Sequence, residues 1–185
     1  IAIFGIGFKH NLTMEIICKE NFKTNEWAGG ITREVCILPA EGSSLQDRNF
    51  ELRVSSAVIN ATESTFSDFT GFTRQILCLE GRITLCVEGQ TVDLSNENLF
   101  EFDGAAKVTS VNTPGAVDLN IIYKRGTRVR ARVAHGEHLF TDVERMLVFA
   151  IGSQTTLNGT SLRQHDAAWV SGDVRVSGHM LCVEM

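Results

Sequence analysis

The 185-residue chain has 43% hydrophobic and 21% charged residues, which is enough for a buried core and excludes a disordered or fibrous protein. The net charge is −5, and only the segment 124–132 is rich in Lys and Arg, which argues against a nucleic-acid partner. Five cysteines without CxxC spacing predict free thiols and a reducing compartment, so we expect the cytoplasm. The apolar opening is too short to span a bilayer, and we expect no membrane association.

Residues 1–13 precede Met14, where a more ordinary sequence starts. We interpret them as an N-terminal extension or a non-native segment and leave them out of the fold prediction.

From residue 14 onward, short runs of alternating apolar and polar residues are separated by Gly, Asn and Asp, a pattern of strands without amphipathic helices. In chain order the predicted strands are 15–18, 32–38, 50–59, 73–79, 82–87, 90–94, 98–102, 107–112 and 117–123, then 128–133, 137–140, 145–151, 154–157, 160–163, 167–170, 174–176 and 179–184.

Two passages, 74–104 and 145–173, repeat the same order of strands and glycine-containing turns. Strand, tight turn, strand, tight turn, strand is typical of a cupin-type jelly roll. The repeat therefore predicts an all-β, bicupin-like double jelly-roll barrel. Residues 14–124 are expected to form the first barrel and residues 125–185 the second, packed as one compact unit.

Two arginines lie inside predicted strands. Alternation places Arg53 on one face with Ser55 and Ala57, and it places Arg74 on one face with Ile76. A single arginine on a half-buried strand normally points to solvent, but a pair favours a polar cavity.

Several motifs occur in a fixed order: TNEWAGGITREVCILP, FELRVSSAVI, TFSDFTGFTRQILCLEG, FEFDG and VDLNIIYKR. Together, over about residues 14–125, they resemble the HutD/Ves family of small β-proteins. The resemblance implies a bicupin fold and a cytoplasmic bacterial protein, associated in some members with histidine utilisation or stress response. It implies no established catalytic activity.

We predict no metal or other cofactor. A metal-binding cupin needs two histidines and a carboxylate that converge with a further histidine, and residues 14–134 contain no histidine. The turn from His135 to His138 offers two imidazoles and Glu137, but residues three apart in a turn need not converge. His165 and His179 lie beside turns and are expected to be solvated.

The expected cavity is cationic and rich in hydrogen-bonding groups. The planar forks of Arg53 and Arg74 suit a carboxylate, with Ser55 and Asn120 adding neutral hydrogen bonds. Asp118 is expected to pair with one of the arginines. Trp27 is expected to close the mouth of the cavity. The predicted ligand-binding set is Trp27, Thr32, Arg53, Ser55, Arg74, Asp118 and Asn120. The alternative is a buried salt-bridge network of Arg53, Arg74 and Asp118 that only fixes the register of the barrel.

Three classes of function remain open. The leading prediction is a metal-free binding or regulatory protein that senses a small anionic metabolite, for which the family resemblance implies formylglutamate or a related acyl amino acid. A second is a metal-independent isomerase or epimerase. A third is a structural scaffold whose second barrel forms a homodimer surface.

Overall fold

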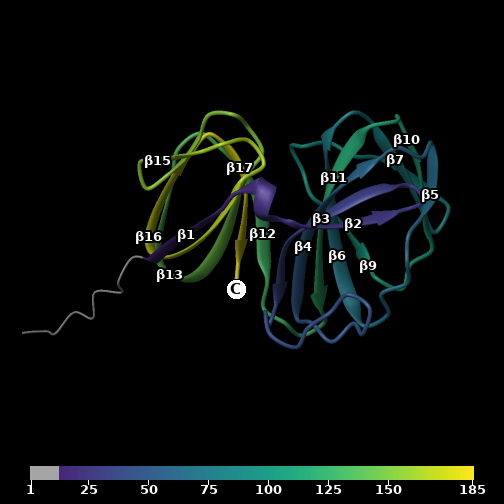
Figure 1. Ribbon diagram of the computed structural model, residues 1–185, viewed down its shortest axis with the longest axis horizontal. Helices are drawn as coiled ribbons and strands as arrows, with labels where there is room; N and C mark the ends of the chain where they lie inside the picture. The colour runs from purple at the N-terminus through teal and green to yellow at the C-terminus, as the bar shows by residue number, and fades with distance from the viewer. Residues whose placement is uncertain (1–12) are drawn as a thin grey trace, which may run out of the picture.

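The computed structural model describes residues 13–185, so the prediction for residues 1–13 lies outside the described residues except at Thr13. Two β-rich halves lie side by side (Figure 1). The described residues contain one helix, the short 3₁₀ turn η1 (Lys19–Asn21). No helix in this part of the chain has the length and hydrophobicity needed to span a membrane.

The N-terminal half consists of two antiparallel sheets. The larger has six strands in the order β2 (Lys23–Trp27), β3 (Gly30–Leu38), β4 (Leu52–Ile59), β11 (Ala116–Lys124), β6 (Phe72–Glu80) and β9 (Phe100–Asp103). The smaller has four strands in the order β5 (Glu63–Thr65), β10 (Val108–Asn112), β7 (Ile83–Val87) and β8 (Gln90–Asp93).

The C-terminal half is one seven-stranded sheet. Its main path runs β12 (Arg130–His135), β17 (His179–Glu184), β13 (His138–Ala150), β16 (Ala167–Ser177), β14 (Thr155–Leu157) and β15 (Thr160–Leu162). The seventh strand, β1 (Thr13–Ile17), pairs antiparallel with β16. The predicted all-β, bicupin-like class is confirmed, although the sheets do not close into continuous hydrogen-bonded barrels.

The position of β1 differs from the predicted division of the chain. The sequence pattern predicts residues 14–17 in the first barrel, whereas their strand lies against the C-terminal half (Figure 1). Alternation identifies a strand but does not tell which sheet edge it joins. Strand β1 therefore belongs to the C-terminal sheet although it precedes the N-terminal half in the sequence.

Two short strands were not predicted. Both β2 and β5 are polar along their length and lie at sheet edges, where few side chains are buried. Conversely, β13 and β16 each join two predicted strands into one. The register of β13 against β16 shifts between Phe140 and Val143 and again before Met146, so these strands bend without ending.

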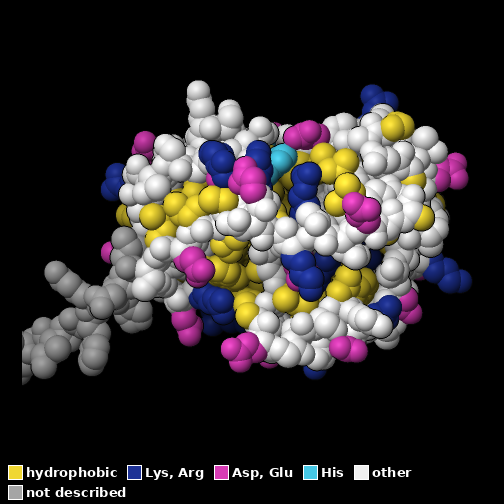
Figure 2. All heavy atoms as spheres, viewed as in Figure 1, with side chains coloured by type: hydrophobic (Ala, Val, Ile, Leu, Met, Phe, Trp, Pro, Cys, Tyr) yellow, Lys and Arg dark blue, Asp and Glu magenta, His cyan; other side chains and the backbone are white. Residues whose placement is uncertain are grey.

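The six-stranded sheet has two different faces. One face packs against the C-terminal sheet, so that Leu52 and Leu119 share a hydrophobic cluster with Phe149 and Leu181. The other face turns toward the four-stranded sheet and packs partly against Ile83. The C-terminal half also has a core of its own. On the face drawn in Figure 2, charged side chains of both signs are interspersed.

Candidate functional site

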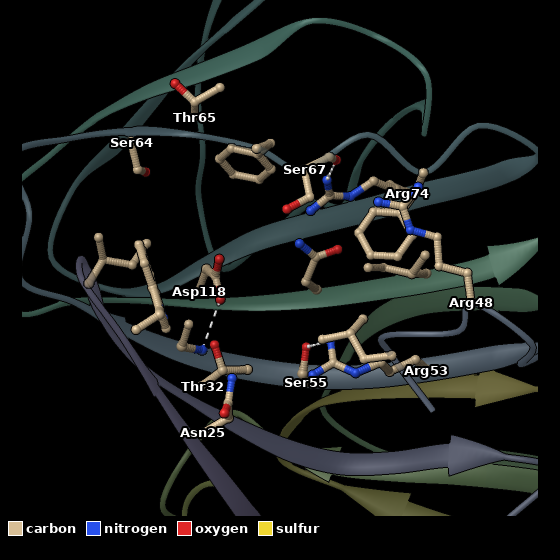
Figure 3. Close-up of a pocket in the computed structure, with 18 of the residues that line it drawn as sticks. Asn25, Thr32, Arg48, Arg53, Ser55, Ser64, Thr65, Ser67, Arg74 and Asp118 are labelled. Atoms are coloured by element: carbon tan, nitrogen blue, oxygen red, sulfur yellow. Dashed lines mark hydrogen bonds between the residues drawn. The ribbon is translucent and has the colours of Figure 1, made fainter. Parts of the chain in front are cut away.

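A cavity of about 420 Å³ opens on the inner face of the six-stranded sheet, bounded by β5 and by the loops at residues 45–48 and 66–69. All seven residues of the predicted ligand-binding set line it, namely Trp27, Thr32, Arg53, Ser55, Arg74, Asp118 and Asn120. Figure 3 labels Thr32, Arg53, Ser55, Arg74 and Asp118 among them. Their role in binding remains a prediction, but the structure brings them together in one place.

Strand alternation explains this gathering. In β4, Arg53 and Ser55 point into the cavity while Leu52 and Val54 enter the core shared with the C-terminal half. Strand β11 lies beside β4 with Asn120 directly opposite Ser55, so the polar face of one strand continues into that of the next. The cavity is therefore the polar side of a sheet whose other side is a hydrophobic core.

Arg53 is buried, with 5% of its surface exposed. Its Nε donates to Glu34 Oε2 at 2.7 Å, and its Nη1 donates to Ser55 Oγ at 2.8 Å. Glu34 is the ionic partner of this arginine, and sequence analysis missed it. The rest of the guanidinium faces the cavity.

Arg74 is equally buried but has no carboxylate partner among the described residues. Its guanidinium lies over the rings of Phe66, Phe102 and Phe69, at 4.7, 5.1 and 5.4 Å from their centres. Nη1 makes one long contact, 3.4 Å, to the carbonyl oxygen of Ser67, and the buried Nε has no hydrogen-bond partner. Burial lowers the pKa of Arg74 to about 10, so the group still carries its charge at neutral pH.

Asp118 does not pair with either arginine, and the predicted ion pair is wrong. Its Oδ1 accepts a hydrogen bond from the backbone N–H of Ala57 at 2.9 Å. Sharing a face with an arginine does not place a short aspartate within reach of it, and Arg53 reaches the neighbouring strand β3 instead. The alternative of an Arg53–Arg74–Asp118 salt-bridge network is excluded by the same geometry. Burial raises the pKa of the Asp118 carboxyl to about 7.

Asn120 is also buried, and its Oδ1 has no hydrogen-bond partner in the described part of the chain. In the view of Figure 3, the arginines lie on one side of the cavity and Asp118, Thr32 and Asn25 on the other. The cavity therefore has a cationic end and an end that offers a carboxyl, an amide and a hydroxyl.

Trp27 stands at the rim of the cavity, with 41% of its surface exposed. Its ring covers Gly29, where an added Cβ would lie 2.0 Å from the indole. Thr32, on the next strand, lies opposite Ala57 of β4. The Trp-x-Gly-Gly-x-Thr segment thus folds as a hairpin that presents both side chains to the cavity.

Sequence analysis missed part of the lining. Arg48 lies in an irregular loop with a left-handed backbone, φ 52°, and its guanidinium stacks on Phe69 at 4.9 Å. No periodicity marks such a loop residue. Phe66, Ser67 and Phe69 lie in the segment FSDF, whose sequence signals a resemblance to the family but no place in a cavity.

No histidine or cysteine of the described chain lines the cavity. Its chemistry is that of three arginines, one carboxyl group, three amides and several hydroxyls. Such a set can hold an anion through charge and a second polar group through neutral hydrogen bonds.

Residues 19–181 match the HutD family. The structure of HutD from Pseudomonas fluorescens SBW25, in a formate condition, is 25% identical to this chain, with a TM-score of 0.81 over 93% of this chain and 97% of that one. A conserved protein of unknown function from Pseudomonas aeruginosa PAO1 is also 25% identical, with a TM-score of 0.79 over 93% and 98% of the two chains.

A bacterial pirin from Escherichia coli, solved in complex with nickel(II), is similar in fold alone, with 9% identity and a TM-score of 0.66 over 92% of this chain and 97% of that one. The comparison with curated proteins finds no significant match. The family match, the two HutD-like structures and the order of the motifs lead to one conclusion: this chain belongs to the HutD family.

Proposed function

We propose that this protein binds a small anionic metabolite in the cavity of its N-terminal half and acts as a sensor or regulator. The observation that carries the proposal is Arg74, a buried cation whose Nε has no hydrogen-bond partner and which has no carboxylate partner within residues 13–185. A buried charge without an ionic partner is unfavourable, and a ligand carboxylate would compensate it. The volume of about 420 Å³ lies within the range of about 300–1,000 Å³ that small-molecule sites occupy.

The two ends of the cavity indicate the class of ligand. A carboxylate at the arginine end would accept hydrogen bonds from the guanidinium groups of Arg53 and Arg74. A second polar group at the opposite end meets the Asp118 carboxyl and the Asn25 amide. Acyl amino acids have both parts, and formylglutamate, to which the family resemblance points, is our first candidate.

A thermal-shift screen tests the proposal directly. Formylglutamate, other acyl amino acids, dicarboxylates and keto acids are added at millimolar concentration, and the unfolding temperature is recorded. A ligand that prefers the native state raises that temperature, and calorimetry then gives its affinity. If none of these anions stabilises the protein, the sensor proposal fails.

A second candidate function is a metal-independent isomerase or epimerase. The observation that favours it is Asp118, whose raised pKa of about 7 suits a group that takes up and releases a proton near neutral pH. Under this proposal a bound ligand is converted, and Asp118→Asn abolishes the conversion while leaving binding at the arginine end. NMR of each stabilising ligand after incubation with the protein decides between binding and turnover.

A further inference from the structure

A second cluster of polar side chains lies outside the cavity, where the two halves meet. His135 ends β12 and His179 begins β17, and the two residues are direct cross-strand partners. The next pair, Gly136 and Gly178, exchanges both backbone hydrogen bonds, at 2.8 and 3.2 Å. The histidines therefore occupy a non-hydrogen-bonded position, where cross-strand side chains come closest. Their rings are stacked, with centres 4.0 Å apart.

The third member of the cluster comes from the other half. Glu97 lies in the loop between β8 and β9, and its Oε2 is 2.7 Å from His135 Nε2. His179 Nε2 lies 3.1 Å from the carbonyl oxygen of Asn96 in the same loop. One ligand atom from each of Glu97, His135 and His179 falls within 4.8 Å of the others.

The strand that carries His179 is firmly held. The His179 carbonyl oxygen accepts hydrogen bonds from the backbone N–H groups of Ile151 and Gly152, at 3.0 and 2.9 Å, and from Thr155 Oγ1 at 3.0 Å. An added Cβ at Gly152 would lie 3.2 Å from His179 Cβ, so the backbone of Gly152 packs closely against the start of the His179 side chain. The pair is thus positioned by the sheet before anything binds.

We propose that Glu97, His135 and His179 bind a borderline divalent cation such as Zn²⁺, which fastens the β8–β9 loop of the N-terminal half to the C-terminal sheet. Two imidazole nitrogens and one carboxylate oxygen, with water in a fourth position, are a common ligand set for this class of metal. Metal bonds of about 2.0–2.2 Å place ligand atoms about 3.3 Å apart. The Glu97 and His135 atoms, now 2.7 Å apart, would move apart slightly, which two exposed side chains allow.

A simple ion pair is the alternative to a metal site, but it explains the position of fewer residues. Glu97 and a protonated His135 would form such a pair without His179. The stacked partner His179 has no part in that ion pair, whereas two neutral imidazoles can both ligate a metal. On metal binding, His179 would exchange its contact with the Asn96 carbonyl for the metal bond, with its ring proton on Nδ1.

Isothermal titration of the full chain with Zn²⁺, purified without a histidine tag and freed of metal, tests the site. We expect one Zn²⁺ per chain at near-neutral pH. His135→Ala, His179→Ala and the nearly isosteric Glu97→Gln should each weaken binding at least tenfold. His138→Ala is the matched control, because His138 belongs to the same turn but lies outside the cluster. Affinity should also fall more than tenfold at about pH 5.5, because protons compete for the imidazole nitrogens.

The described chain offers one other group of potential metal ligands, Cys18, Glu20 and Asp166. Two controls distinguish binding there from binding at Glu97, His135 and His179. Cys18→Ser should leave Zn²⁺ affinity unchanged, and Co²⁺ bound in place of Zn²⁺ should show no thiolate charge-transfer absorption. No binding at micromolar Zn²⁺, loss of binding in Cys18→Ser, or an equal effect of His138→Ala and His179→Ala would each overturn the proposal. None of the substituted residues lines the cavity, so these outcomes do not depend on whether the cavity binds an anion.

Discussion

Arg74 shows how a sheet can keep a buried charge available for a ligand. Three aromatic rings surround its guanidinium and offset part of the cost of burial, at about 0.5–2 kcal/mol for each close contact. A carboxylate partner would offset more of the cost but would also neutralise the site. Arg53 is such a case, since Glu34 already satisfies part of its fork. The two arginines therefore differ in what they can offer to an anion.

If these arginines recognise a carboxylate, Arg74→Lys keeps the charge but loses the planar fork, and affinity for the anion should fall by about 1.5–3 kcal/mol. Arg53→Lys should also lower the affinity, but by less, because Glu34 and Ser55 already accept from part of the Arg53 fork. Calorimetry with the best ligand of the screen measures both. Arg132→Lys is the control, because Arg132 also stacks on a phenylalanine and pairs with a glutamate but lies outside the cavity.

The opposite result would mean that the two arginines stabilise the fold and do not bind the anion. In that case Arg53→Lys and Arg74→Lys would lower the unfolding temperature and leave anion affinity unchanged.

Asp118 predicts a specific pH dependence. Its pKa is raised from 3.8 to about 7 in the folded protein, so between these values the folded state binds more protons than the unfolded state. Stability attributable to this group is present at low pH and is lost as pH rises toward 7, by at most about 1.4 kcal/mol per pH unit. Asp118→Asn removes this dependence, and its amide oxygen can still accept from Ala57 N–H. The free energy of unfolding of Asp118→Asn, relative to that of the wild type, should therefore rise from about pH 4 to pH 7.

Urea unfolding of both proteins across this range measures the difference. A constant difference across the range would show that Asp118 is ionised throughout in the folded state.

At the scale of the strand, the pairing of β3 with β4 depends on the glycine that begins β3. A Cβ at Gly30 would lie 2.0 Å from the carbonyl oxygen of Val58, and backbone cannot move aside as a side chain can. Gly30→Ala should therefore destabilise the protein by about 1–3 kcal/mol, as overpacking does. Because β3 also carries Thr32 into the cavity, anion affinity should fall as well.

Gly89→Ala serves as the comparison. Nothing lies within 4 Å of a Cβ at Gly89, whose φ is 85°, so that variant bears only the conformational cost of about 1 kcal/mol and should bind the anion normally. Equal unfolding midpoints for the two variants would contradict the steric account.

Alternation predicted the cavity well, because each strand face is decided by its own residues. Arg53 and Asn120 could be assigned to one interior from sequence for that reason, and the structure places both there. What alternation cannot supply is contact between strands distant in sequence. The Arg53–Glu34 bond depends on the register of β3 against β4, and the pairing of His135 with His179 depends on which strands are neighbours. Edge strands such as β5 lack the apolar face that makes a strand recognisable.

At the scale of the whole molecule, the two halves share one hydrophobic core. Phe149 of the C-terminal sheet is fully buried in the same cluster as Leu77 and Leu119 of the six-stranded sheet. Strand β1 adds a second connection, since the chain begins its described part in the C-terminal sheet before it enters the N-terminal half. We therefore expect the halves to unfold together.

The chain contains two tryptophans, and each reports on one half: Trp27 at the cavity rim and Trp169 in β16. In Trp27→Phe and Trp169→Phe backgrounds, fluorescence follows the unfolding of a single half.

Phe149→Ala removes a large side chain from the shared core and should destabilise the protein by about 3–5 kcal/mol. Because the core is common, the midpoints reported by Trp27 and by Trp169 should fall by the same amount. Leu139→Ala, on the same strand but 63% exposed, should move neither midpoint. A shift seen by Trp169 alone would mean that the halves fold separately and that the shared cluster is only a contact between them.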